Sequence, residues 1–117
     1  MTINIKRAYQ TAEHADGFRI LVDRLWPRGV TKEKASVDLW LKDVGPSNEL
    51  RKWFGHDPAR WQEFNSKYHA ELKSRKDLLD QLKQAESEHK TITLVYAAKD
   101  EAHNNAVVLK QVLEGAS

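Results

Sequence analysis

Residues 19–29 have the sequence RILVDRLWPRG, and they decide how the chain is expected to fold. The segment begins with an apolar run at 20–22, which is typical of a strand covered on both faces of its sheet. Charged and aromatic side chains follow directly, and Pro27 and Gly29 then turn the chain. Because ligands of open α/β sheets bind at the carboxyl ends of strands, we expect a binding surface at 23–29.

The whole chain predicts four strands and several helices. Alternating or continuous apolar residues predict strands at 3–5, 18–25, 37–42 and 91–97. Thr31 begins a short helical turn, a helix covers 78–88, and the N-cap candidates of the other helices are Ser47, Asp57 and Asp100. The spacing of apolar side chains predicts that the core includes Trp40, Trp53, Phe54, Trp61, Ala102, Ala106, Leu109 and Leu113.

These elements predict one α/β domain over residues 1–117. We expect a central, mostly parallel or mixed four-stranded sheet flanked by helices on both faces. About eight residues join the first two strands, whereas a parallel crossover usually needs roughly a dozen. The direction of the first strand relative to the second therefore stays open.

The composition is that of an ordinary globular protein, with 40% hydrophobic and 31% charged residues. The 19 basic and 17 acidic residues leave a net charge of +2, so any attraction of anions has to come from local clustering. The chain has no cysteine, which excludes disulfides, zinc–thiolate sites and thiol nucleophiles. There is no visible signal peptide and no apolar run of about 20 residues, so we expect a cytoplasmic protein that does not associate with membranes.

Cationic side chains near strand ends are the main candidates for ligand binding. Arginine presents a rigid fork of donors that matches a carboxylate or a phosphate. The predicted ligand-binding residues, on a rim built from 23–29, 42–47 and 99–104, are Arg24, Trp26, Arg28, Lys42, Lys99 and Asn104. The alternative interpretation is that the arginines pair internally with Asp23, Asp43 and Asp100, and the sequence leaves both open.

Three titratable residues are candidates for catalysis: Asp23, His56 and His103. Histidine suits a general base because it titrates near neutral pH, although a capping role for His56 and a solvated helix surface for His103 are ordinary alternatives. Aspartate and histidine also suit divalent ions, yet no pair of histidines has the spacing of a metal motif. The chain lacks a phosphate loop, a nucleophile elbow and a dinucleotide fingerprint, so we predict no cofactor and no metal site.

Four ordered segments carry a resemblance to a known family. They are LVDRLWPRG at 21–29, DLWLKDV at 38–44, ELRKWFGHDP at 49–58 and YAAKDEAHN at 96–104, and they resemble the YeaO-like family of small bacterial proteins. The resemblance implies an α/β domain from a bacterial cytoplasm and brings no established reaction. Some longer members of the superfamily carry cysteines where Tyr96 and Asn104 stand here, so this chain lacks their thiol chemistry.

The leading hypothesis is a site that binds, or turns over, a small anionic or phosphorylated molecule. A nucleic-acid-binding module is the second hypothesis, with Lys6, Arg7 and Arg51 joining the rim arginines on phosphates. A metal-assisted hydrolase and an interaction subunit without a ligand are further alternatives. The ligand, the reaction and the oligomeric state stay open.

Overall fold

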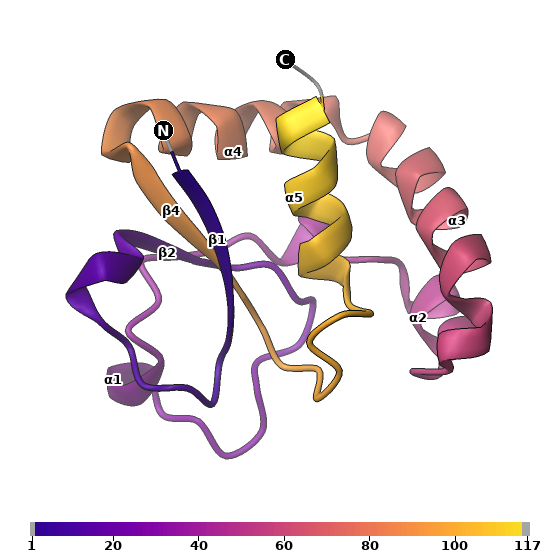
Figure 1. Ribbon diagram of the computed structural model, residues 1–117, viewed down its shortest axis with the longest axis horizontal. Helices are drawn as coiled ribbons and strands as arrows, with labels where there is room; N and C mark the ends of the chain where they lie inside the picture. The colour runs from indigo at the N-terminus through magenta and orange to yellow at the C-terminus, as the bar shows by residue number, and fades with distance from the viewer. Residues whose placement is uncertain (1, 116–117) are drawn as a thin grey trace.

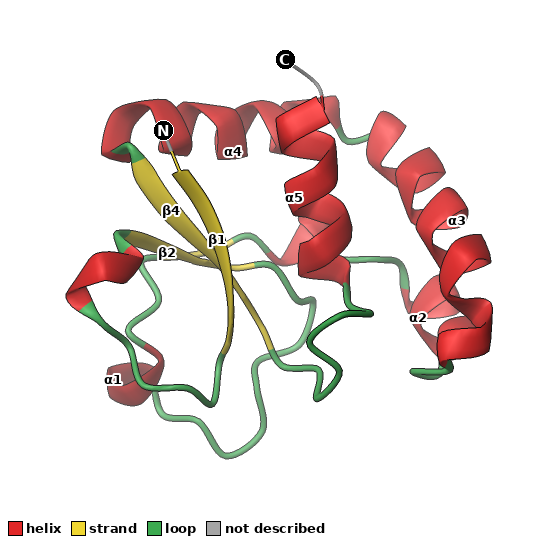
Figure 2. Cartoon of the chain, viewed as in Figure 1, coloured by secondary structure: helices red, strands yellow, loops and turns green. Residues whose placement is uncertain are grey.

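The computed structural model describes residues 2–115 and has one four-stranded sheet with helices packed around it (Figures 1 and 2). The sheet order is β1-β4-β2-β3, and every pairing is parallel. The strands are β1 (Thr2–Arg7), β2 (Phe18–Leu21), β3 (Leu39–Trp40) and β4 (Thr91–Tyr96). The α/β class and the four-stranded sheet expected from the sequence are confirmed, with the parallel form of the sheet.

Within residues 2–115, five α-helices pack against the sheet. They are α1 (Lys32–Ala35), α2 (Asn48–Phe54), α3 (Trp61–Lys73), α4 (Lys76–His89) and α5 (Asn105–Gly115). Ser47 caps α2 as predicted, because its hydroxyl accepts a 3.1 Å hydrogen bond from the backbone N–H of Leu50. Asp57 likewise caps a one-turn 3₁₀ helix, Pro58–Arg60, that leads directly into α3. No helix within residues 2–115 has the length and apolar character needed to cross a membrane.

The relation between the first two strands is settled by β4, which lies between them and runs parallel to both. The short connection works because it passes close to β4 on its way to β2. The Thr93 hydroxyl donates a 2.6 Å hydrogen bond to the carbonyl of Asp16, and a Cβ added to Gly17 would lie 2.3 Å from the carbonyl oxygen of Thr91. Gly17, at φ +65°, is therefore required by both conformation and space.

The two faces of the sheet are covered unequally. The larger core contains Ile20, Val22, Ile92 and Leu94 together with buried side chains of α2, α3, α4 and α5. The other face has a smaller cluster of Ala8, Leu21 and Val95, against which Trp26 and Val37 pack. Helices on both faces were expected, and here the longer helices share one face while the other has α1 and loops.

The second and third strands are shorter than predicted. β2 ends at Leu21 rather than at 25, and β3 contains two residues instead of the segment 37–42. β3 lies at the edge of the sheet, and Trp40, predicted to be core, is 39% exposed. Its indole N–H donates to the carbonyl of Asp23 at 2.7 Å, so Trp40 fastens the loop after β2 instead of filling the core.

The last helix begins later than predicted. The Asp100 carboxylate accepts hydrogen bonds from the N–H groups of Ala102 and His103, at 2.9 and 3.1 Å, within a separate turn. Asn104 is the residue that caps α5, because its side-chain oxygen accepts from the N–H of Val107 at 3.1 Å. Ala102 is consequently exposed, whereas Ala106, Leu109 and Leu113 are buried as predicted.

Candidate functional site

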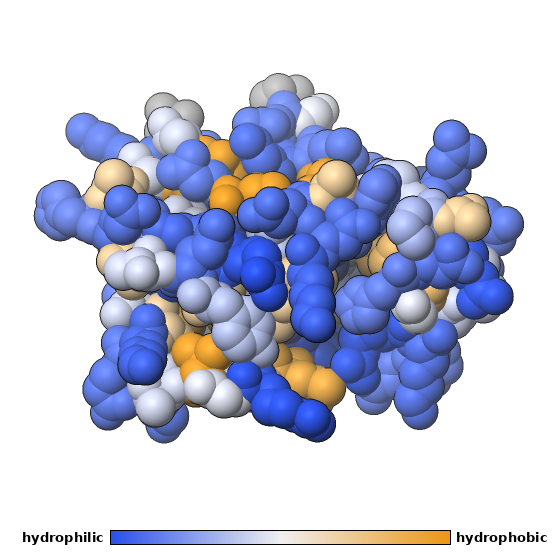
Figure 3. Space-filling view, turned by 60° about the horizontal axis from the view of Figure 1, so that its bottom comes forward, coloured by the Kyte–Doolittle hydropathy of each residue, from blue (hydrophilic) through white to orange (hydrophobic). Residues whose placement is uncertain are grey.

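A cavity of about 840 Å³ opens where β2 and β4 end, and we call it the rim cavity. Its walls come from the loop after β2, the loop after β4, and the residues around α2 and the start of α5. Figure 3 brings this end of the molecule forward and shows apolar patches on a mostly hydrophilic surface. Among the lining residues, Tyr9 and Leu25 are large apolar side chains with 49% and 59% of their surface exposed.

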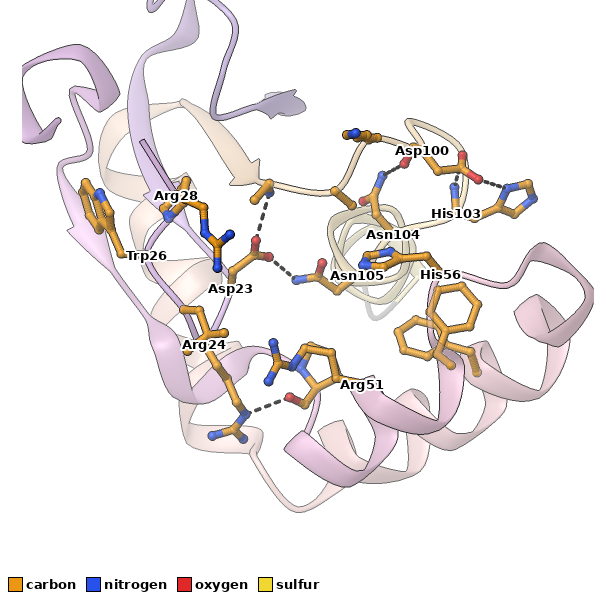
Figure 4. A pocket seen from close by; sticks show the side chains of 18 of the residues that line it. Asp23, Arg24, Trp26, Arg28, Arg51, His56, Asp100, His103, Asn104 and Asn105 are labelled. Carbon is orange, nitrogen blue, oxygen red and sulfur yellow. Dashed lines mark hydrogen bonds and ion pairs between the residues drawn. The ribbon is translucent and has the colours of Figure 1, made fainter. Parts of the chain in front are cut away.

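Asp23 lies in the middle of the rim cavity (Figure 4). One carboxylate oxygen accepts from the N–H of Ala97 at 2.9 Å, and the other accepts from the side-chain amide of Asn105 at 3.0 Å. Burial raises the pKa of Asp23, although these hydrogen bonds and the nearby Arg51 and His56 act in the opposite direction. The carboxylate therefore joins the ends of β2, β4 and α5 at the centre of the site.

Arg24 is committed to internal partners. Its Nε donates to the carbonyl of Pro46 at 2.8 Å, and its Nη1 lies 3.6 Å from a carboxylate oxygen of Asp43. Figure 4 shows its guanidinium turned away from the middle of the cavity. For this residue the structure has the internal pairing that the sequence left open.

Arg28 and Lys99 both line the rim cavity. Both side chains are exposed, and neither guanidinium nor ammonium makes a hydrogen bond or ion pair within residues 2–115. The backbone of Arg28 is held by the Tyr9 hydroxyl, which donates to its carbonyl at 3.0 Å. The following Gly29 has φ +78°, which allows the loop to turn beside the cavity.

Arg51 is the lining residue that the sequence assigned only to a nucleic-acid surface. Its Nη2 donates to the side chain of Asn48 at 3.1 Å, while its Nε is buried and has no hydrogen-bond partner. It is the one such buried side-chain nitrogen or oxygen in the part of the chain that the structure describes. An arginine next to Leu50 on a short helix gives no sequence signal for an unsatisfied donor, since that depends on the fold around it.

The histidine candidates lie on the side of the cavity opposite Trp26 (Figure 4). His103 Nδ1 is 2.8 Å from the Asp100 carboxylate, and its ring meets Trp61 edge-on at 5.1 Å. The hydrogen bonds from His103 and from the Ala102 N–H hold the pKa of Asp100 below its ordinary value. His56 is exposed at φ +57°, with its ring 6.3 Å from that of Phe54.

The remaining predicted residues differ in their placement. Trp26 is half-buried at the cavity wall, and its indole N–H donates to the carbonyl of Val30 at 2.7 Å. Asn104 also lines the cavity, but its amide is used in capping α5 and in a 3.0 Å bond to the carbonyl of Asp100. Lys42 is not among the lining residues, and its ammonium lies 5.7 Å from the centre of the Trp40 ring.

The metal-type residues do not gather into a ligand set. Within residues 2–115 there is no group of three or more His, Cys, Asp or Glu side chains that could hold a metal ion. Asp43 pairs with Arg24, and Asp100 with His103.

Comparison with known proteins places the chain in a family. A family model described as "Inactive DUF488-N3 subclade" matches residues 2–117. The chain belongs to this subclade. It is 42% identical to the uncharacterized protein YeaO of Escherichia coli over 109 residues, which cover 93% of this chain and 94% of YeaO.

A second relative of this protein comes from Mycobacterium tuberculosis. The uncharacterized protein Rv3073c is 40% identical over 113 residues, covering 97% of this chain and 94% of that protein. The resemblance to the YeaO-like family is therefore confirmed across nearly the whole chain. No solved structure matches this protein.

Proposed function

We propose that this protein binds a small anionic molecule in the rim cavity. The observation that supports this most is the pair of unsatisfied arginines: the Arg28 guanidinium has no partner in the described chain, and the Arg51 Nε is buried without one. A buried donor without an acceptor is costly, and because the Arg51 side chain lines the cavity, an anion that draws its guanidinium outwards would supply the acceptor. Arginine is also the side chain best suited to carboxylate and phosphate.

Two further features support an anion in the same place. Lys99 adds an unpaired positive charge to the cavity lining. The first turn of α5 begins beside Asp23, where Asn105 both starts the helix and lines the cavity, and the amino end of a helix favours negative charge. These groups come from α2, α5 and the loops after β2 and β4, so the folded chain assembles the site.

Binding without catalysis is the form of the proposal that has the most support. The family is described as inactive, and the chain has no cysteine. Asp23 and the Asp100–His103 pair are the proton acceptors that turnover would use. The cytoplasmic location stays a prediction.

The nucleic-acid alternative has less support. It needs Lys6 and Arg7 on phosphates, but Lys6 is paired with Glu13 at 2.8 Å and Asp16 at 3.2 Å. The Nε of Arg7 donates to the carbonyl of Ala98 at 2.9 Å. Of the three residues that this alternative adds to the rim arginines, Arg51 lines the rim cavity while Lys6 and Arg7 have internal partners.

The proposal is tested by thermal unfolding with sodium phosphate, sulfate or nucleotides against sodium chloride at equal ionic strength. A ligand at ten times its Kd stabilises a protein by about 1.4 kcal/mol, which corresponds to a Tm increase of roughly 6 °C at this chain length. We expect such an increase for at least one anion. Isothermal titration calorimetry then gives its Kd.

Phosphate and sulfate also stabilise proteins by exclusion from the surface, so variants are needed as controls. The double variant Arg28→Ala, Arg51→Met should lose the Tm increase. Lys83→Ala removes one positive charge from an exposed position on α4, outside the cavity, and should keep it. An equal increase in all three proteins, or none in any of them, contradicts the proposal.

A further inference from the structure

The rim cavity has two unlike walls, and this difference carries information about the ligand. Arg28 and Arg51 carry positive charge towards the middle of the cavity, while Phe54, Phe64 and the ring of His56 form an aromatic wall (Figure 4). Phe54 and Phe64 stack on each other with centroids 4.3 Å apart and are buried, so the exposed ring of this wall is that of His56. A ligand that uses both walls has a charged end and an apolar, flat body.

The charges around the cavity favour an anion with more than one negative charge. Asp100 accepts hydrogen bonds from its own turn, and its lowered pKa keeps it negatively charged. Four cationic residues line the cavity, Arg24, Arg28, Arg51 and Lys99, and they outnumber the two carboxylates, Asp23 and Asp100. A phosphate monoester brings close to two negative charges at neutral pH and several strong acceptor oxygens, whereas a carboxylate brings one charge.

The cavity is larger than a bare phosphate needs, which favours a larger ligand. Its volume of about 840 Å³ lies in the range of ligand pockets and is far larger than the roughly 30 Å³ that one water molecule occupies. Inorganic phosphate would leave the exposed ring of His56 in contact with water. An organic body attached to the phosphate would bury it.

The residues at the floor of the cavity favour a hydrogen-bond donor on the organic part of the ligand. The side-chain amide N–H groups of Asn105 donate to the Val22 carbonyl and to Asp23, both at 3.0 Å, which fixes the orientation of the amide. The Asn105 side-chain oxygen accepts no hydrogen bond within the described chain. It therefore presents an acceptor beside the Asp23 carboxylate.

We propose, building on the proposed function, that the ligand is a phosphate monoester whose organic part is a flat ring system with an N–H or O–H donor. This is the chemistry of a nucleoside monophosphate. The phosphate lies against Arg28, Arg51 and Lys99, the ring against Phe54 and His56, and the donor meets Asn105 and Asp23.

Isothermal titration calorimetry with defined probes tests this inference on the full chain. The probes are inorganic phosphate, ribose 5-phosphate, adenosine, and the 5′-monophosphates of adenosine, guanosine, cytidine and uridine. Stacking of one base on an aromatic surface is worth about tenfold or more in affinity. We expect at least one monophosphate to bind about tenfold or more tightly than inorganic phosphate and ribose 5-phosphate, and adenosine to bind more weakly than its monophosphate.

A pair of variants separates the two walls. His56→Asn removes a ring and keeps a residue that tolerates the left-handed conformation, so it should weaken the monophosphate and leave inorganic phosphate unchanged. Arg51→Met should weaken both. If inorganic phosphate binds as tightly as every monophosphate, or if His56→Asn changes nothing, this inference fails while anion binding stands. If no phosphate-bearing probe binds, this inference fails, and the proposed function fails with it unless sulfate raises the Tm.

Discussion

The two ends of β2 hold their arginines in opposite ways. At the first end, Arg19 is 3% exposed, and its guanidinium donates to the Asp16 carboxylate at 2.6 Å and to the Ala35 carbonyl at 2.8 and 3.1 Å. At the carboxyl end, Arg24 is paired with Pro46 and Asp43, but Arg28 has no side-chain partner in the described chain and Arg51 keeps a buried Nε without an acceptor. Arg19 therefore differs from Arg28 and Arg51 in the supply of acceptors.

That difference separates a structural role from a binding role. An arginine with all its donors paired inside the protein has nothing left to offer a ligand, and its removal leaves acceptors without partners. An arginine that lines a cavity with donors unpaired contributes little to the fold, and its removal costs binding. The predictions below use substitutions that would make the two ends behave alike if this interpretation is wrong.

The largest effect is expected for Arg19→Met. It leaves the Ala35 carbonyl without its donor and leaves Asp16 with Lys6 as its cationic partner. Breaking a buried ion pair by removing one member typically costs 3–5 kcal/mol, and we expect a loss of about 3 kcal/mol because Lys6 still faces Asp16. Urea denaturation measures the free energy of unfolding. Arg28→Met is the matched control, and its change should stay within about 0.5 kcal/mol.

Substituting the glycine at the first end of β2 should cost more stability than substituting the glycine beyond its carboxyl end. Gly17→Ala combines a positive φ of +65° with a Cβ only 2.3 Å from the Thr91 carbonyl oxygen, so we expect a loss of about 2–3 kcal/mol. Gly29 has φ +78°, but a Cβ there would meet nothing within 4 Å, so Gly29→Ala should cost about 1 kcal/mol. Urea denaturation of both variants compares them. Equal losses would show that the close crossing of β4 costs nothing.

Features of the fold and the cavity that depend on residues close together in the sequence could be predicted, whereas features that depend on residues far apart could not. Local patterns predicted the strands around β1 and β4, the Ser47 cap and the buried positions Ala106, Leu109 and Leu113 of α5. An apolar run followed by charges marks the end of a buried strand, and residues 23–28 of the segment 19–29 line the rim cavity, although their role in binding stays a prediction. Both depend on neighbouring residues alone.

Non-local pairing accounts for what the sequence missed. Asn104 instead of Asp100 caps the last helix, because the turn after β4 uses the Asp100 carboxylate first. Trp40 is exposed because β3 lies at the sheet edge, which alternation within 37–42 cannot show. The importance of Arg51 depends on acceptors that the fold fails to place near its Nε.

The aspartates at the two ends of β2 should change the stability of the fold in opposite directions as the pH falls. Hydrogen bonds from Glu13, Lys6 and Arg19 outweigh the effect of burial and lower the pKa of Asp16 below its ordinary 3.8, while burial raises that of Asp23. The stability that Asp16 contributes is therefore present above pH 3.8 and is lost as the pH falls below it. Ionised Asp23 destabilises the fold, and this cost disappears as the pH falls through its raised pKa towards 3.8.

Urea denaturation between pH 7 and pH 3 tests these signs with Asp16→Asn and Asp23→Asn. The stability lost in Asp16→Asn should be largest at pH 7 and should shrink below pH 3.8. Relative to the unsubstituted protein, the free energy of unfolding of Asp23→Asn should be more favourable at pH 7 than at pH 4. Effects smaller than those of Gly17→Ala are expected, and parallel pH profiles for the two variants would contradict the assignment.

Arg51→Met should have a small effect on stability and a large effect on binding. Methionine keeps a long apolar side chain and removes the buried Nε that lacks an acceptor, which favours the folded state. Asp23 loses a positive neighbour, and the bond to Asn48 is lost, which offsets part of that gain. The free energy of unfolding should therefore change by less than about 1 kcal/mol, while the Kd of a bound phosphate rises by about tenfold or more.

Arg51→Lys sharpens this test because it keeps the charge and removes the guanidinium fork. Its affinity for phosphate should fall between those of the unsubstituted protein and Arg51→Met, with stability unchanged in urea denaturation. A loss of more than about 2 kcal/mol in Arg51→Met would make Arg51 as structural as Arg19. The contrast between the ends of β2, and the anion site that depends on it, would then have no basis.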